Sequence, residues 1–250
     1  MVQVNTAFVT GASSGLGLEL CRELVRREYR VAMFARDAER LEREAAALGA
    51  SGQILAFTGD VTDVHSVRAA VEHVEATWGP IDLAIANAGI RQATWAVGFP
   101  LQGAEQLMET NYFGMLHLFD AVMPRMLKRD QGCFVGIASL AGVRCLPGGS
   151  AYGASKAAMQ TFLDTVRLEL ISHGIRVVTV NPWFVRTHQT DDKVPRPMMV
   201  DADWAAKTIV RRIEAGNTQI EFPFLPSLAW KLIRLLPNRT FALLFAPRRK

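Results

Sequence analysis

The chain has 250 residues, 50% of them hydrophobic and 21% charged, which fits a single α/β domain with a large core. Its formal net charge is +4, but residues 221–250 hold six basic residues against one acidic residue, so the basicity belongs to the tail. This distribution argues against a nucleic-acid partner, which would need a basic face on the body, and three scattered cysteines argue against a disulfide framework or a metal site.

Short apolar runs rich in Val, Ile, Ala and Phe alternate with longer amphipathic segments up to residue 222. This pattern predicts a parallel sheet covered by helices on both faces. The expected strands are Thr6 to Thr10, Arg30 to Ala35, Gln53 to Thr58, Leu83 to Asn87, Gly132 to Ala138, Arg176 to Asn181 and Gln219 to Phe222. The helical patterns begin near Gly15, Ala38, Asp63, Gly103, Ala151 and Asp201. Seven strands alternating with six helices predict one doubly wound, Rossmann-type domain over residues 1–222, with ligands at the carboxyl ends of the strands.

A glycine-rich turn, TGASSGLG, joins the first strand to the first helix at residues 10–17. Gly11, Gly15 and Gly17 let the backbone approach a pyrophosphate, and the helix N-terminus offers unpaired N–H groups and a favourable dipole to the anion. The position between a strand and a helix is the context that a dinucleotide-binding fingerprint requires. We therefore expect a dinucleotide at this turn. The other turn residues expected to contact it are Ser13, Ser14 and Leu16.

The second strand ends in Ala35, followed by Arg36, where such folds meet the ribose of the adenosine half. A carboxylate there would bind the 2′-hydroxyl and repel a 2′-phosphate, whereas an arginine accepts the phosphate through charge-assisted hydrogen bonds. Arg36 therefore predicts NADP as the cofactor. NAD is the alternative cofactor because of Asp37. If the second strand ended at a shifted position, this carboxylate would lie at the ribose.

Tyr152 and Lys156 stand four residues apart in AYGASKAAM, so they share one face of the helix that begins near Ala151. A positive charge near a phenol oxygen favours the phenolate and moves the pKa of a tyrosine from about 10 toward the working range of a general acid or base. The spacing is common in helices, so its context decides whether it is functional.

That context resembles the classical short-chain dehydrogenase/reductase family. The resemblance covers about residues 5–190. It includes the glycine-rich turn and then, in chain order, Asp60, Asn87 to Gly89, Asn111, Ser139, Tyr152 with Lys156, and Asn181 with Pro182. Several matches in the right order are far more specific than any single motif.

The resemblance implies an oxidoreductase that interconverts carbonyls and alcohols. Tyr152 is then the general acid/base that protonates the carbonyl oxygen, and Lys156 both lowers the phenol pKa and binds the nicotinamide ribose. Ser139 orients the carbonyl, and Asn111 holds a proton-relay water near the lysine. Because the cofactor supplies only hydride, the proton donor and the dipole aimed at the oxyanion have to come from the protein. The family is usually oligomeric, which implies a homodimer or homotetramer.

The resemblance also places further residues at the cofactor. They are Asp60, Val61, Asn87, Ala88 and Gly89 and, after the sixth strand, Pro182, Val185 and Thr187. The family usually has glycine after this proline, whereas the chain has Trp183. Its side chain could narrow the nicotinamide pocket, or shift the loop and alter the contact of Thr187.

Three loops, residues 91–99, 140–149 and 183–200, are expected to form the substrate pocket. Their large apolar side chains favour an apolar or bulky carbonyl compound over a sugar phosphate. The expected substrate contacts are Ser139, Trp95, Leu146, Trp183 and Met198. The same loops contain three arginines that could bind an anionic group of the substrate, which is a further alternative: Arg91, Arg144 and Arg196.

Residues 223–250 form a basic, apolar tail, which Pro226, Pro237 and Pro247 interrupt too often for one membrane-spanning helix. Its Trp230, leucines and basic residues suit an interfacial helix that contacts a membrane peripherally. The tail has two alternative placements, over its own substrate pocket or in a subunit interface. A strand begins almost at the first residue and leaves no room for a signal sequence, so we expect a cytoplasmic protein, with the membrane surface as a second location.

The sequence thus predicts an NADP(H)-dependent oxidoreductase that interconverts a carbonyl and a secondary alcohol on a lipophilic substrate. Two alternatives remain: a dinucleotide-sensing protein without turnover, and an NAD-preferring dehydrogenase of the same family. An epimerase or dehydratase is disfavoured, because the short C-terminal part leaves little room for a separate substrate domain.

Overall fold

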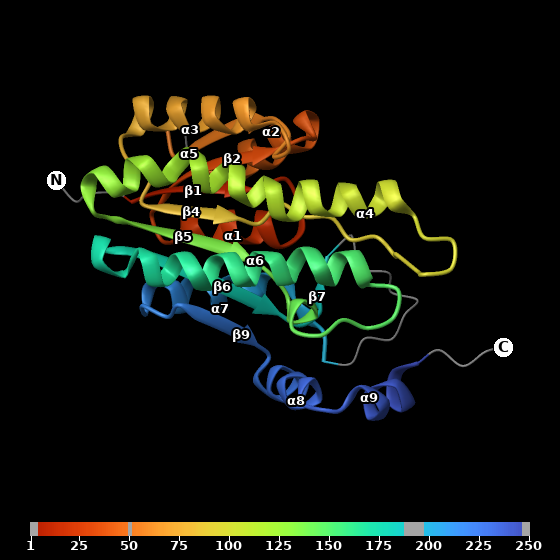
Figure 1. Ribbon diagram of the computed structural model, residues 1–250. Helices are drawn as coiled ribbons and strands as arrows, with labels where there is room; N and C mark the ends of the chain where they lie inside the picture. The colour runs from red at the N-terminus through yellow and green to blue at the C-terminus, as the bar shows by residue number, and fades with distance from the viewer. Residues whose placement is uncertain (1–4, 50–51, 188–197, 247–250) are drawn as a thin grey trace.

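The computed structural model describes residues 5–49, 52–187 and 198–246 (Figure 1). Its main sheet has seven strands in the order β3-β2-β1-β4-β5-β6-β9, and each neighbouring pair is parallel. These strands are β1 (Thr6–Thr10), β2 (Arg30–Ala35), β3 (Ile54–Thr58), β4 (Leu83–Ala86), β5 (Gly132–Ile137), β6 (Ile175–Pro182) and β9 (Gln219–Phe222). The predicted doubly wound sheet is confirmed, and its strand ends move by one residue at most. A short parallel pair, β7 (Val185–Arg186) with β8 (Val200–Asp201), was not expected.

Helices cover both faces of the sheet (Figure 1). One face packs against α1 (Gly15–Arg26), α2 (Ala38–Leu48) and α7 (Ala202–Glu214), and the other against α3 (Val64–Trp78), α5 (Gly114–Arg129) and α6 (Ser150–Glu169). Successive strand residues enter opposite layers, so Val9 joins the core with α1 and α7 while Phe8 joins the core with α3, α5 and α6. Burial on both faces explains why the strands read as continuous apolar runs.

The helix expected near Gly103 is divided in the structure. α4 (Leu101–Met108) passes into a π-helical segment, η1 (Glu109–Phe113), before α5 begins at Gly114. A π segment is a local widening of a helix and is frequent at functional sites. Here it carries Asn111, whose side chain is fully buried. The apolar pattern of the sequence gives no sign of this widening.

The chain after β9 forms two short helices, α8 (Phe224–Arg234) and α9 (Asn238–Phe245), which lie below β9 in Figure 1. Trp230 anchors α8, because its indole N–H donates hydrogen bonds to the backbone oxygens of Leu140 at 3.1 Å and Arg144 at 3.0 Å. Its ring also lies 5.3 Å from the ring of Trp183. The tail is thereby fastened to the loop after β5, which also carries Ser139.

Arg144 binds the tail from the loop side. Its guanidinium donates to the backbone oxygens of Arg234 at 3.2 Å and Leu236 at 2.8 Å, near the C-terminal end of α8, where carbonyls lack helical partners. The guanidinium also lies 3.7 Å from the ring centroid of Phe241. The alternative that Arg144 meets an anionic substrate is therefore wrong, because the tail engages its donors. Arg196 lies outside the described residues.

Candidate active site

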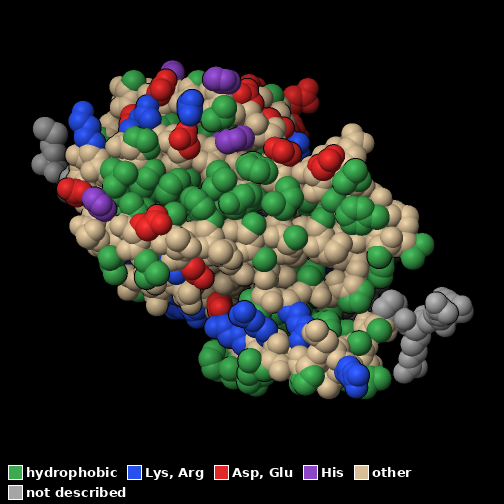
Figure 2. Space-filling view, viewed as in Figure 1, with side chains coloured by type: hydrophobic (Ala, Val, Ile, Leu, Met, Phe, Trp, Pro, Cys, Tyr) green, Lys and Arg blue, Asp and Glu red, His purple; other side chains and the backbone are tan. Residues whose placement is uncertain are grey.

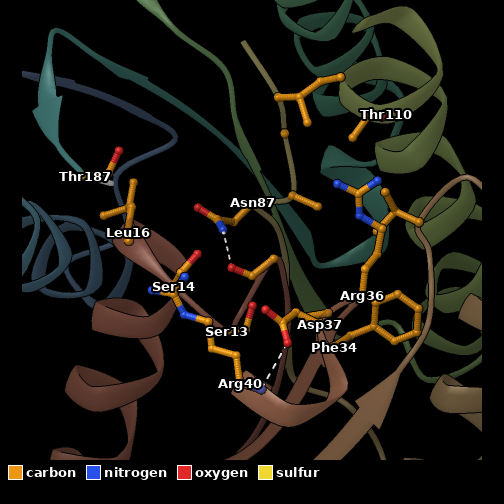
Figure 3. Close-up of a pocket in the computed structure, with 18 of the residues that line it drawn as sticks. Ser13, Ser14, Leu16, Phe34, Arg36, Asp37, Arg40, Asn87, Thr110 and Thr187 are labelled. Atoms are coloured by element: carbon orange, nitrogen blue, oxygen red, sulfur yellow. Dashed lines mark hydrogen bonds between the residues drawn. The ribbon is translucent and has the colours of Figure 1, made fainter. Parts of the chain in front are cut away.

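A cavity of about 310 Å³ lies at the carboxyl edge of the sheet, where β1 and β4 are neighbours and the strand order reverses (Figure 3). Doubly wound folds bind their ligands at this position. The expected cofactor residues that line it are Gly11, Ser13, Ser14, Gly15, Leu16, Gly17, Arg36, Val61, Asn87, Ala88, Gly89 and Thr187. It is also lined by Phe34, Ala35, Asp37, Arg40, Gly59, Ile90 and Thr110.

Close backbone approach shapes the turn from β1 to α1. A Cβ on Gly17 would lie 2.1 Å from the backbone oxygen of Gly11, so only glycine allows α1 to start this close to β1. Gly11 itself has a φ of +66°, in the left-handed region that L side chains rarely adopt. α1 therefore begins at Gly15 with its first-turn N–H groups at the cavity, an arrangement that suits the phosphates of a dinucleotide.

Asn87 ties the ends of β1 and β4 together. Its Nδ2 donates to the backbone oxygens of Thr10 at 3.0 Å and Gly11 at 3.3 Å. In return, the Thr10 hydroxyl accepts the backbone N–H groups of Asn87 and Ala88, both at 3.1 Å. These bonds fix Ala88 and Gly89 in the cavity wall, so Asn87 supports the wall as well as lining it. Its direct contact with the cofactor stays a prediction.

Arg36 and Asp60 form an ion pair near the ends of β2 and β3. The Nη1 atom of Arg36 lies 3.4 Å from Oδ2 of Asp60. Burial raises the pKa of Asp60, but hydrogen bonds from Thr62 and the charge of Arg36 outweigh burial and hold this pKa below its ordinary value. Arg36 lines the cavity, whereas the described walls do not include Asp60. The direct contact of Asp60 with the cofactor stays a prediction.

Asp37 and Arg40 stand at the start of α2, beside Arg36 (Figure 3). The Asp37 carboxylate accepts a hydrogen bond from the backbone N–H of Arg40 at 3.1 Å and caps α2. This capping role explains the presence of a carboxylate here without a contact to the ribose. Arg40 lines the cavity, and its buried Nε has no hydrogen-bond partner among the described residues. Sequence reasoning missed Arg40. The available signal was a second basic residue in the first turn of the helix that follows Arg36.

Tyr152 lies in the first turn of α6 and Ser139 lies just after β5, close enough for the Ser139 hydroxyl to affect the pKa of the phenol. Burial raises the pKa of Tyr152, and the Ser139 hydroxyl and the charge of Arg91 partly oppose this rise. The sequence led us to expect Lys156 to lower this pKa. In this geometry burial has the largest effect on the pKa of Tyr152, and the opposing effects come from Ser139 and Arg91; that the charge of Lys156 favours the phenolate stays a prediction.

Lys156 is buried behind the cavity wall, one turn along α6 from Tyr152. Its Nζ donates to the backbone oxygen of Ile137 at 2.8 Å and lies 5.9 Å from the centroid of the Tyr152 ring. A Cβ on Gly89 would come within 3.6 Å of the same atom, which places the ammonium next to this wall residue. Burial lowers the pKa of Lys156 to about 8, so the ammonium is charged at neutral pH and loses its proton under mildly alkaline conditions.

Asn111 fastens the loop after β4 to α6. Its Oδ1 accepts the backbone N–H of Ile90 at 2.8 Å, and its Nδ2 donates to the Ile90 oxygen at 3.1 Å and to Oγ of Ser155 at 3.0 Å. The Ser155 hydroxyl in turn donates to the backbone oxygen of Tyr152 at 2.8 Å. The π-helical segment thus positions the helix that carries Tyr152 and Lys156. The expected relay water stays a prediction.

Residues 5–197 match the family model described as short chain dehydrogenase. The chain belongs to the short chain dehydrogenase family. It is 35% identical over 240 residues to an uncharacterized oxidoreductase of Myxococcus xanthus, and the match covers 94% of each chain. A variant of actinorhodin polyketide ketoreductase with NADPH superimposes with a TM-score of 0.80 at 28% identity, over 87% of this chain and 95% of that one. A short chain dehydrogenase of Burkholderia cenocepacia in complex with NADP shares the fold, with a TM-score of 0.84 at 24% identity over 99% of this chain and 100% of that one.

Membership of the short chain dehydrogenase family makes the chain an oxidoreductase with a nicotinamide dinucleotide site. The departure at Trp183 involves the tail, because the Trp183 ring packs on Trp230 and lies 4.8 Å from the ring of Phe184. Pro182 ends β6 and Val185 begins β7, and the described cavity walls include neither residue. Their cofactor contacts stay predictions.

The expected substrate residues come from separate loops around Tyr152. Trp95 packs over Gly148, and an isolated β-bridge joins Thr94 to Gly149, so the loops after β4 and β5 lie side by side. Leu146 belongs to the second of these loops and is half-buried. Met198 is exposed and stands next to the residues that are not described, so its place in the pocket stays a prediction.

We expect the free energy of unfolding of the wild-type protein to rise relative to that of a Lys156→Met variant between pH 7 and pH 9.5. The pKa of Lys156 is about 8 in the folded protein and about 10.5 in the unfolded chain, so the unfolded chain binds the extra proton at alkaline pH. Rising pH therefore favours the folded state, by about 2 kcal/mol over this interval. Urea unfolding at the two pH values measures the difference.

The control is Lys207→Met, because Lys207 is an exposed lysine of α7 that pairs with Asp203. This variant should follow the wild-type pH dependence closely. If Lys156→Met also follows it, Lys156 does not titrate as a buried ammonium.

Proposed function

We propose that this protein is an NADP(H)-dependent oxidoreductase that interconverts a carbonyl and a secondary alcohol on a lipophilic substrate. The observation that carries the proposal is the arrangement of Tyr152, Ser139 and Lys156 beside the wall of the cavity at the carboxyl edge of the sheet. A phenol near a hydroxyl group, with a buried ammonium nearby, is suited to proton transfer at an oxygen atom. The ketoreductase at 28% identity supports carbonyl chemistry.

The roles of the three side chains follow from their environments. When bound, the nicotinamide supplies the hydride for the carbonyl carbon. Tyr152 holds the proton for the carbonyl oxygen, because its raised pKa keeps the phenol protonated at neutral pH. The Ser139 hydroxyl donates a hydrogen bond to the developing oxyanion, and the charge of Lys156 stabilises the phenolate that remains. Oxidation of the alcohol runs these proton steps in reverse and gains from higher pH.

We assign NADP rather than NAD because two arginines serve the adenosine end of the cavity. Arg36 and Arg40 both line it, and the buried Nε of Arg40 lacks a partner among the described residues. A 2′-phosphate would satisfy these donors through charge-assisted hydrogen bonds. The competing carboxylate, Asp37, is engaged as the cap of α2. The NADPH of the related ketoreductase supports the same choice.

We also propose a homodimer or homotetramer. Figure 2 shows hydrophobic side chains in a band across the face that α5 and α6 form. Phe113, Leu168 and Ile171 are among the exposed apolar residues of η1, of α6 and of the turn after it. Burial between two copies would remove this apolar surface from water. A mass of 27.6 kDa in solution, measured by light scattering, would contradict the assembly.

Peripheral contact with a membrane through α8 and α9 completes the proposal. The side of α8 with Trp230 is fastened to the protein, and its opposite side exposes large apolar residues at helical spacing. The exposed residues are Phe224, Leu225, Leu228, Leu232 and Leu235, and α9 adds Leu243 and Leu244. Basic side chains border them (Figure 2), so the surface suits anionic lipid. In the ranges that the structure describes, no helix is long and apolar enough to cross a membrane.

We expect Tyr152→Phe to lower kcat/KM for NADPH-dependent reduction of apolar ketones by about 10³-fold, because the variant lacks the proton donor. Its affinity for NADPH, measured by fluorescence titration, should stay within about 3-fold of wild type. Tyr29→Phe, at a half-buried tyrosine next to β2, is the control and should retain full activity. Full turnover in Tyr152→Phe would refute the mechanism. A wild-type protein that binds NADPH but reduces no ketone would instead be a dinucleotide sensor.

Arg36→Ala and Arg40→Ala should each raise the Kd for NADPH by about 10- to 100-fold, because each variant loses a charged donor to the 2′-phosphate. The Kd for NADH should change by less than about 3-fold. Arg43→Ala is the control, since Arg43 is an exposed residue of the same helix that pairs with Glu44. A wild-type preference for NAD would overturn the assignment.

A triple variant tests the membrane contact by replacing three exposed leucines with serine: Leu228, Leu232 and Leu235. The triple variant should lose co-sedimentation with vesicles of neutral and anionic phospholipid that retain the wild-type protein, because apolar insertion drives binding. Reduction of a water-soluble ketone should not change, and Leu101→Ser, at an exposed leucine of α4, should still bind. A triple variant that keeps its vesicle binding but dissociates into smaller particles would assign this face to a second copy of the chain.

A further inference from the structure

Arg91 lies on a loop that is held at fixed positions on both sides. One residue before it, Ile90 exchanges two hydrogen bonds with Asn111. Three residues after it, Thr94 donates its backbone N–H to the Gly148 oxygen at 2.8 Å, and its hydroxyl accepts the N–H of Ala151 at 3.0 Å. Because Ala151 adjoins Tyr152 in α6, these bonds fix the backbone of Arg91 relative to the catalytic tyrosine.

The guanidinium of Arg91 lies between two aromatic rings of the active site. Its central carbon is 6.0 Å from the ring centroid of Tyr152 and 5.8 Å from that of Phe184. Its charge lowers the pKa of the Tyr152 phenol and of the Cys145 thiol, although burial has the larger, opposite effect on both groups. The guanidinium is therefore within electrostatic range of the atom that transfers the proton.

Within the described residues, no acidic side chain neutralises the charge of Arg91. Of the carboxylates in the described ranges, none forms an ion pair with Arg91. By contrast, Arg36 pairs with Asp60, and Arg144 donates to the tail. An exposed guanidinium that stacks on aromatic rings keeps its fork of N–H donors free for a planar anion.

We propose that Arg91 is a specificity-determining residue that binds a carboxylate of the substrate, a few bonds away from the reacting carbonyl. The substrate is then an oxo acid with an apolar remainder, which the apolar loops around Trp95, Leu146 and Trp183 accommodate. Reduction adds hydride to the carbonyl carbon and the Tyr152 proton to its oxygen, giving the hydroxy acid. Arg91 takes no proton in this reaction. The assignment rests on the proposed function and names its substrate class.

A matched pair of substrates tests the carboxylate contact: 2-oxooctanoate and 4-oxooctanoate, each beside its methyl ester. The wild-type protein with NADPH should have a kcat/KM at least about 10-fold higher for one of the acids than for its ester. Arg91→Gln should lower kcat/KM on that acid by about 30- to 100-fold and on the ester by less than about 3-fold. Arg91→Lys should recover part of the loss, because it keeps the charge and loses the fork. Arg68→Gln, at an exposed arginine paired with Asp120, should leave both substrates unaffected.

Equal losses on acid and ester would show that Arg91 acts only on the Tyr152 phenol, and would overturn the assignment. A binding measurement separates this outcome from failure of the proposed reaction. Octanoate, titrated calorimetrically into the NADPH-bound protein, should bind at least about 10-fold more tightly than octanamide, and Arg91→Gln should remove the difference. If no ketone is reduced but octanoate binding still depends on Arg91, the carboxylate site stands and the reaction is wrong. If esters are reduced and octanoate binding is independent of Arg91, the reaction stands and the carboxylate site is wrong.

Discussion

The junction of β1 and β4 is the constraint on which the rest of this molecule depends. The strand order reverses there, so the chain leaves the two strand ends in different directions and a cavity opens between them. The opening is kept narrow by hydrogen bonds between Asn87 and Thr10, and by the missing side chain at Gly17, where a Cβ would approach the Gly11 oxygen to 2.1 Å. The same contacts hold the start of α1 and the residue Gly89 in the wall of the cavity. The cofactor site and the catalytic site that we propose both depend on this junction.

Burial disfavours the charged form of both Tyr152 and Lys156, the residues for which we propose roles in proton transfer. It raises the pKa of Tyr152 and lowers that of Lys156. The protein compensates with specific partners: Ser139 for the phenol and the Ile137 oxygen for the ammonium. For reduction this balance is favourable, since the phenol must carry its proton before the carbonyl arrives.

Two sets of contacts outside the cavity hold the substrate side of the site. Asn111 and Thr94 fix the loop after β4 against α6, and Trp230 fixes the loop after β5 against the tail. The tail is thus connected to the loop of Ser139, and its outward side is the apolar surface for which we propose lipid contact. An apolar oxo acid is an amphiphile, so the Arg91 site and the lipid-facing tail are consistent with one kind of substrate, although each rests on its own observations.

The sequence by itself determined the order of strands and helices along the chain and the glycine-rich turn, and it predicted Ser139, Tyr152 and Lys156 as the catalytic residues. Apolar periodicity and glycine spacing are local properties, and a parallel α/β sheet preserves them because each strand is buried on both faces. Only the tertiary structure decided four further features. They are the π-helical segment at Asn111, the position of Arg40 in the cavity wall, the binding of Arg144 to the tail and the position of Arg91 over the Tyr152 ring. It also decided that burial has the largest effect on the pKa of Tyr152. Each of these depends on which distant segments pack against a side chain, and residue types at a given spacing do not encode that packing.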